Sequence, residues 1–125
     1  MLISNKKINI ASEALSYFSL ANFKRRMQNY KEAIENYTKA IELYHNFAEA
    51  YYKRANVKIN IGDYQGALED YDSAINIDPN LAEAYNNRGA LKLKLGDENG
   101  ANIDFLQAGM LGYVKAYDVN KDFCL

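Results

Sequence analysis

The sequence has no tryptophan, and it contains one proline, one cysteine and one histidine among its 125 residues. A single cysteine, Cys124, cannot form an internal disulfide, which favours a reducing compartment. The net charge of −1 excludes a global positive field that would recruit nucleic acid or an anionic membrane. There is no apolar run of the roughly 18–20 residues that cross a bilayer, and no signal-peptide pattern. These features predict a cytoplasmic protein that does not enter a membrane.

Residues that perform chemistry are also scarce. The lone histidine, His45, falls in a predicted turn, and Cys124 has no histidine near it in sequence, so neither belongs to a nucleophile–base pair. The acidic cluster of Glu69, Asp70 and Asp72 lacks the glycine turn and the ligand spacing of a calcium loop. No glycine-rich phosphate loop is present. We therefore expect no catalytic residue, no metal site and no cofactor, and a protein that is not an enzyme.

What the sequence does contain is a repeat of 34 residues. The segment 48–81, AEAYYKRANVKINIGDYQGALEDYDSAINIDPNL, matches the chain again when it is shifted by 34 positions in either direction. The shared positions are Tyr17, Tyr51 and Tyr85; Ala33, Ala67 and Ala101; Tyr37, Tyr71 and Phe105; and Ala40, Ala74 and Ala108. Repeats of this length are helix–turn–helix units that bury their apolar faces by stacking on their neighbours.

The period divides the chain into three repeats with short ends. The repeats are 14–47, 48–81 and 82–115, preceded by an N-terminal arm, 1–13, and followed by a short capping tail, 116–125. The turn signals predict helices at about 12–27, 30–44, 48–61, 64–77, 82–95, 98–110 and 113–122. The arm either covers the open face of the first repeat or is loose.

Two kinds of helix start are predicted. Asp63 and Asp97 are good N-cap residues, and each follows a glycine that suits the left-handed end of the preceding helix. Ser12 and three asparagines, at positions 29, 46 and 80, are expected to begin the other helices. Glu32 is the expected capping-box partner of Asn29.

The repeat resembles the tetratricopeptide repeat over residues 14–115. The matching residues are Tyr51, Ala55, Gly62, Tyr64, Ala67, Tyr71, Ala74 and Pro79. The resemblance implies an all-α fold, a right-handed superhelical α-solenoid of antiparallel helix pairs with about seven helices. It also implies that the first helix of each repeat lines a concave groove that holds a peptide or protein segment. The expected role is that of an adaptor or scaffold, with a partner whose identity is unknown.

The helical period predicts which side chains of these inner helices face the groove. The expected partner-binding residues are Phe18, Asn22, Tyr52, Lys53, Asn56, Asn86 and Asn87. Asn22 and Asn56 are one period apart and should stack as a short ladder, since an amide can donate and accept at once, as a peptide unit requires. Idealised repeats of this family also have asparagine and tyrosine at these sites, so a generic origin of the pattern stays open.

One subtype of the family is not expected. Chaperone-binding members hold a C-terminal carboxylate with a clamp of five side chains. Asn22 matches one clamp position, but Phe18, Lys53, Glu83 and Asn87 replace the other four, and Glu83 would repel a carboxylate.

Arginine and aspartate occur together in two repeats and are both missing from the first. Arg54 and Arg88 stand where the first repeat has leucine, and Asp70 and Asp104 follow sixteen residues later, where the first repeat has asparagine. We predict that Arg54 pairs with Asp70 and Arg88 with Asp104, or that Asp70 crosses to Arg88, since a guanidinium suits a partly buried bidentate pair. The alternative is that these side chains are all exposed and the coincidence is accidental.

Lysine recurs at one further equivalent position, 24, 58 and 92. These lysines form either a basic stripe for phosphates or, as we prefer, stems that cover apolar surface while their heads reach water. The run Lys24-Arg25-Arg26 is too short, and too poor in aromatic neighbours, to predict a nucleic-acid site.

The ends of the array suggest a second possible role. Leu106 and Met110 in the last repeat would be exposed unless Tyr117 and Phe123 cover them. Incomplete cover would let the repeat ends drive homo-oligomerisation.

Overall fold

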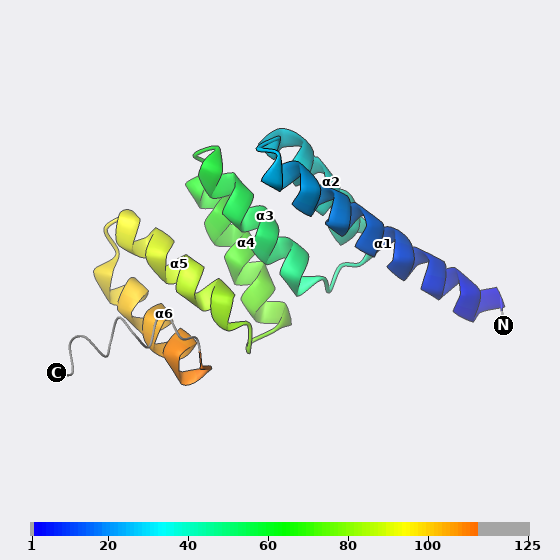
Figure 1. Ribbon diagram of the computed structural model, residues 1–125. Helices are drawn as coiled ribbons and strands as arrows, with labels where there is room; N and C mark the ends of the chain where they lie inside the picture. Colours follow the sequence, from blue (N-terminus) through cyan, green and yellow to red (C-terminus); the bar gives the residue numbers. More distant parts are fainter. Residues whose placement is uncertain (1, 113–125) are drawn as a thin grey trace.

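The chain forms three antiparallel helix pairs that stack in sequence order (Figure 1). The computed structural model describes residues 2–112. Within them the helices are α1 (Leu2–Arg26), α2 (Tyr30–Leu43), α3 (Ala48–Asn60), α4 (Tyr64–Ile77), α5 (Ala82–Lys94) and α6 (Glu98–Met110). The predicted all-α solenoid is confirmed, whereas the helix expected at 113–122 and the tail 116–125 lie outside the described residues.

Small residues and tyrosine at equivalent positions form the core. Ala33, Ala67 and Ala101 of the three outer helices have no exposed surface, so each outer helix can approach its inner helix closely. Tyr37 and Tyr71 are fully buried and fill the space between the alanines. Burial of one large side chain of this kind contributes about 2–3 kcal/mol, so these repeated positions specify the stacking.

Helix α1 begins earlier than the sequence predicts. Ser12 was expected to cap it, but α1 starts at Leu2 and runs without a break to Arg26, so its first part extends past the end of α2 (Figure 1). Residues 2–11 contain neither glycine nor proline, so nothing in them stops the packed part of α1 from extending backward. The expectation of a start at Ser12 was therefore wrong.

Two outer helices begin with the predicted aspartate caps. Asp63 Oδ1 accepts a hydrogen bond from Gly66 N at 3.0 Å, and Asp97 Oδ1 accepts one from Gly100 N at 2.9 Å. A Cβ atom on Gly66 would lie only 2.2 Å from Asp63 Oδ2. With the Asp63 carboxylate in this position, a side chain at residue 66 would force the carboxylate to move.

The same geometry explains why the first outer helix differs. Asn29 is its N-cap residue, as predicted, but the Asn29 side chain makes no cap hydrogen bond. Glu32 occupies the position equivalent to Gly66, so a cap in the geometry of Asp63 would bring the Asn29 side chain close to the Glu32 Cβ. Glu32 instead pairs with Lys24 at 2.7 Å, so the predicted capping box is wrong.

The inner helices α3 and α5 also begin differently from the prediction. Their N-cap residues are Phe47 and Leu81, one residue after the expected Asn46 and Asn80, and neither has a side-chain cap bond. Phe47 is partly buried, and its ring centre lies 4.8 Å from that of Phe18. At this boundary, apolar contact is used in place of a polar cap.

Candidate functional site

Two cavities lie between inner helices α3 and α5. Their volumes are about 280 and 290 Å³. Asn56 and Asn87 line the first, and Tyr52 and Lys53 line the second. The structure thus brings four of the seven predicted partner-binding residues to these two hollows.

The first hollow, which we call the Asn56 cavity, combines apolar and amide side chains. It is lined by Asn56 and Ile59 of α3, Tyr71 of α4, and Asn87, Ala90, Leu91 and Lys94 of α5. Asn56 Oδ1 accepts hydrogen bonds from the Tyr71 hydroxyl and from Asn87 Nδ2, the latter at 3.0 Å. Asn86 Nδ2 donates in turn to Asn87 Oδ1 at 3.4 Å. One amide oxygen therefore joins α3, α4 and α5.

Burial favours the protonated form of the tyrosine in this network. Burial raises the pKa of Tyr71 well above its ordinary value of 10.0, although a hydrogen bond from Asn87 acts in the opposite direction. Burial likewise raises the pKa of Tyr37, with the nearby charge and hydrogen bond of Arg25 opposing it. Both hydroxyls therefore remain protonated donors at neutral pH.

Asn22 occupies the equivalent place in the first pair. Its Oδ1 accepts a hydrogen bond from the Tyr37 hydroxyl, just as Asn56 accepts one from Tyr71. Each amide oxygen thus accepts from the tyrosine of its own helix pair, and Asn56 Oδ1 also accepts from Asn87 of the next pair. No hydrogen bond joins Asn22 to Asn56 in residues 2–112. The Oδ1 atoms of both asparagines therefore serve buried tyrosine hydroxyls, because a buried hydroxyl needs an acceptor. That the two amides line up along a bound peptide stays a prediction.

The second hollow, which we call the Tyr52 cavity, is more polar. It is lined by Ala48, Glu49, Tyr52, Lys53, Asp78, Leu81 and Glu83. The Lys53 ammonium lies 5.4 Å from the centre of the Tyr52 ring. Three carboxylates and one ammonium give this hollow a net negative charge, which would oppose a ligand carboxylate.

Phe18 contributes mainly to packing. Its ring centre lies 5.8 Å from that of Tyr37 and 4.8 Å from that of Phe47. It is only partly exposed, so it joins the first pair to the start of α3.

The structure contains the two arginine–aspartate pairs that the sequence predicts. Arg54 Nε and Nη2 donate to the two oxygens of Asp70 at 2.7 and 2.8 Å. Arg88 Nε and Nη2 contact Asp104 at 2.8 and 2.7 Å. The Asp70 and Asp104 side chains are only 5% and 2% exposed, so an accidental surface coincidence is excluded.

Each arginine also reaches the preceding pair. Arg54 Nη1 donates to Thr38 Oγ1 at 3.0 Å, and Arg88 Nη1 donates to Asp72 at 2.9 Å. The alternative crossing from Asp70 to Arg88 is wrong, because Asp72 fills that role. Burial would lower the pKa of Arg54, but its contact with Asp70 outweighs this and the pKa rises. These fixed charges hold successive outer helices in place behind the groove.

The three equivalent lysines are part of the same arrangement. Lys58 Nζ lies 2.9 Å from Asp70 and Lys92 Nζ lies 3.2 Å from Asp104, while Lys24 pairs with Glu32. Their heads therefore bind carboxylates, whereas we expected them to extend into water. A phosphate stripe is not favoured, because these ammonium groups already have partners.

Two further features of residues 2–112 bear on function. No group of three or more His, Cys, Asp and Glu side chains gathers in a metal-binding arrangement there. None of the helices there combines the length and apolar character needed to cross a bilayer. Cys124 lies outside this range.

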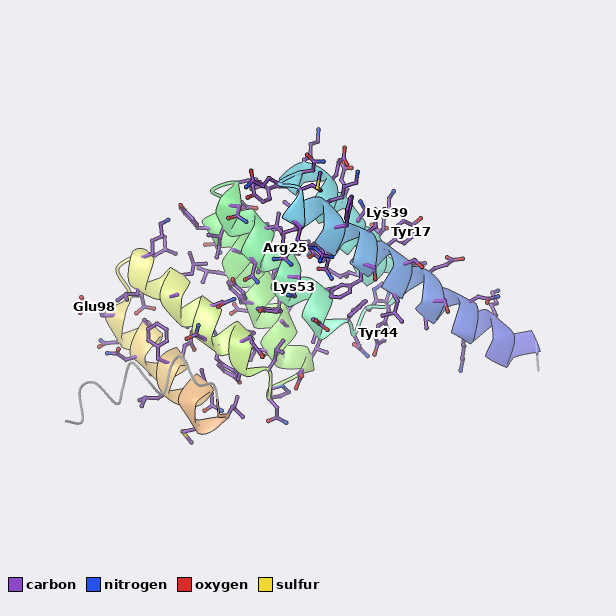
Figure 2. All side chains as sticks on the ribbon, viewed as in Figure 1. Tyr17, Arg25, Lys39, Tyr44, Lys53 and Glu98 are labelled. Atoms are coloured by element: carbon purple, nitrogen blue, oxygen red, sulfur yellow. The ribbon has the colours of Figure 1, made fainter. Side chains whose placement is uncertain are left out.

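Among the residues of the Asn56 cavity that sequence reasoning missed are Ile59, Tyr71 and Leu91. The sequence did contain a signal at Ile59, because Ile59 stands where the first repeat has the longer Arg25. Figure 2 shows Arg25 where α1 passes α3, with Lys53 further along α3. Arg25 Nε is buried without a hydrogen-bond partner among the described residues.

Comparison with known proteins was made by family model and by structure. A model described as a TPR repeat matches residues 21–61 and 56–96. No curated protein matches the chain significantly in sequence. The structure of MamA is 28% identical with a TM-score of 0.78, and it covers 86% of this chain. This chain spans only 63% of the MamA chain.

Two similar structures are of nearly the same length as this chain. The Arabidopsis OM64 TPR domain has a TM-score of 0.84 at 25% identity, covering 90% of this chain and 94% of its own. The second TPR of Spaghetti (RPAP3), bound to the HSP90 peptide SRMEEVD, has a TM-score of 0.81 at 29% identity. It covers 86% of this chain and 98% of its own.

Proposed function

Because the chain belongs to the tetratricopeptide repeat family, we propose that it binds an extended peptide or protein segment along its inner helices and acts as an adaptor. The observation that carries this proposal is the pair of cavities between α3 and α5. The peptide bound to the second TPR of Spaghetti supports the same class of ligand.

The chemistry of the two hollows fits a peptide. The Asn56–Asn87 network uses the Oδ1 atom of Asn56, so the Nδ2 donor of Asn56 is not part of it and can meet a peptide carbonyl. Tyr52 offers a rigid aromatic surface in the neighbouring hollow. Glu83 and the other carboxylates there argue against a ligand held by its C-terminal carboxylate. We therefore propose an internal segment of a partner.

Display of random twelve-residue peptides tests the proposal. We expect the protein to enrich a peptide family, and the double variant Tyr52→Ala/Asn86→Ala to bind those peptides at least about tenfold more weakly, a loss of about 1.4 kcal/mol. The control is Glu69→Ala/Asn76→Ala on exposed positions of α4. Failure to enrich any peptide, or equal binding by both double variants, would exclude binding at this surface.

A specific observation favours a second candidate, self-association through the last pair. Ile103, Leu106 and Met110 of α6 are 67%, 57% and 80% exposed. Glu35 and Glu69 occupy the position of Ile103 in the other pairs, so the solenoid itself does not need an apolar residue there. Light scattering over a range of concentrations should show a dimer that Ile103→Glu/Met110→Glu converts to a monomer. A monomeric parent protein would exclude this candidate.

A further inference from the structure

We propose that the Asn56 cavity is a specificity socket that takes one large apolar side chain, such as Leu, Met or Phe, from the bound segment. The socket is formed by Ile59, Ala90 and Leu91 beside the Asn56–Asn87 network. This inference rests on the proposed peptide-binding function and names the residue that the groove selects.

The Tyr71 hydroxyl, Asn56 Oδ1 and Asn87 beside the socket already have partners. The Tyr71 hydroxyl donates to Asn56 Oδ1, Asn87 Nδ2 donates to the same oxygen, and Asn87 also bonds with Tyr71. An uncharged polar side chain entering the socket would leave water and find the Tyr71 hydroxyl, Asn56 Oδ1 and Asn87 Nδ2 already bonded, which is unfavourable. An apolar side chain gains from contact with Ile59 and Leu91.

The equivalent positions between α1 and α3 hold different residues. Moving back by 34 residues replaces Ile59 with Arg25, and Ala90 with Asn56. Arg25 packs against Tyr37 there, with its Nε atom buried and lacking a partner within the described residues. At that junction a long side chain of the protein itself stands at the equivalent position, beside Tyr37. At the next junction, the shorter Ile59 and Ala90 leave the Asn56 cavity open.

Size and charge identify the occupant. An apolar cavity of about 150 Å³ is large enough to hold benzene, so about 280 Å³ accommodates a side chain as large as phenylalanine. Lys94 lines the same cavity, and its ammonium lies 4.8 Å from the centre of the Tyr64 ring. This positive charge disfavours lysine or arginine in the socket and favours an acidic residue next to the apolar one.

Two variants close the socket with residues that this chain already uses at equivalent positions. Ile59→Arg introduces the residue type of position 25, and Ala90→Asn introduces that of positions 22 and 56. Arg25→Ile is the matched control, because it makes the reverse change one repeat away from the socket. Circular dichroism verifies that each variant is folded, and Ala90→Asn decides the matter if Ile59→Arg fails to fold.

The experiment compares peptides from the random twelve-residue library. We expect one position to be restricted to Leu, Met or Phe. Changing that residue to alanine should weaken binding to the unmodified protein at least about tenfold, but by less than about threefold in Ile59→Arg and Ala90→Asn. In Arg25→Ile the tenfold preference should persist.

The outcomes separate this inference from the function on which it rests. Peptides that bind without any apolar preference, or whose preference survives both socket variants, overturn the socket and leave peptide binding intact. An equal loss of the apolar preference in Arg25→Ile also overturns the socket, because the effect would then not belong to this cavity. Absence of any bound peptide overturns the proposed function and the socket together.

Discussion

The Arg54–Asp70 pair offers the sharpest test of how the stack is held together. Asp70 receives two hydrogen bonds from Arg54 and lies 2.9 Å from Lys58. Its side chain is 5% exposed and that of Arg54 is 15% exposed. Removing one member therefore leaves the other charge in a largely dry site.

The expected magnitudes follow from this burial. Breaking a buried ion pair from one side costs about 3–5 kcal/mol. Lys58 still accompanies Asp70 after Arg54→Leu, and Thr38 still accompanies Arg54 after Asp70→Asn. We therefore expect each single change to lower the free energy of unfolding by about 3 kcal/mol, the lower end of that range.

The double variant should be much milder. Arg54→Leu/Asp70→Asn gives the second pair the leucine and asparagine that the first pair has at Leu20 and Asn36. Because neither charge is then buried, its total cost should stay within about 1 kcal/mol, far below the sum of the two single changes. The assay is urea unfolding followed by circular dichroism for the four proteins of this cycle. Single costs below about 1 kcal/mol, or additive costs in the double variant, would refute the reasoning, since exposed pairs behave in that way.

Three further predictions concern single positions. Burial raises the pKa of Tyr37 and Tyr71 above 10.0, so the folded state holds these protons more tightly than the unfolded state. Stability should be complete below about pH 10 and fall above it, and Tyr71→Phe should make the fall in urea midpoint shallower. Gln28 has a φ of 62°, where glycine stands in the later repeats, so Gln28→Gly should raise the free energy of unfolding by about 0.5 kcal/mol in urea titrations. Asp63→Ala should lower it by about 1 kcal/mol through loss of the cap, whereas Asn29→Ala should change it little, and equal effects would contradict the cap assignment.

The fold could be predicted because the period and the small-residue positions are both local features of the sequence. The two ion pairs could be predicted for a related reason, since arginine and aspartate are present or missing together. The start of α1 could not be predicted in the same way. Ser12 is a good N-cap residue in isolation. The helix continues upstream of it because no helix-breaking residue stands there.

The asparagine positions show where residue-by-residue reasoning ends. Asn22 and Asn56 were correctly placed on inner helices, but their acceptors serve buried tyrosines of the outer helices. In the third pair, Ala90 stands at the asparagine position and Phe105 at the tyrosine position, so the amide and the hydroxyl are missing together. That coincidence is of the same kind as the arginine–aspartate one, and it would have indicated the bond.

Asn56 both lines the cavity and accepts the hydrogen bond of the Tyr71 hydroxyl. These two roles determine which experiments can identify the groove. Asn56→Ala would remove the acceptor of the Tyr71 hydroxyl and leave a buried polar group unpaired, which costs about 1–3 kcal/mol. A loss of binding in that variant would then have two explanations, a missing contact or a disturbed α3–α4 pair. Ile59 and Ala90 line the same cavity and take no part in that bond, since their side chains can neither donate nor accept. Changes at these two positions therefore test recognition separately from stability, and they do so where the repeats themselves differ.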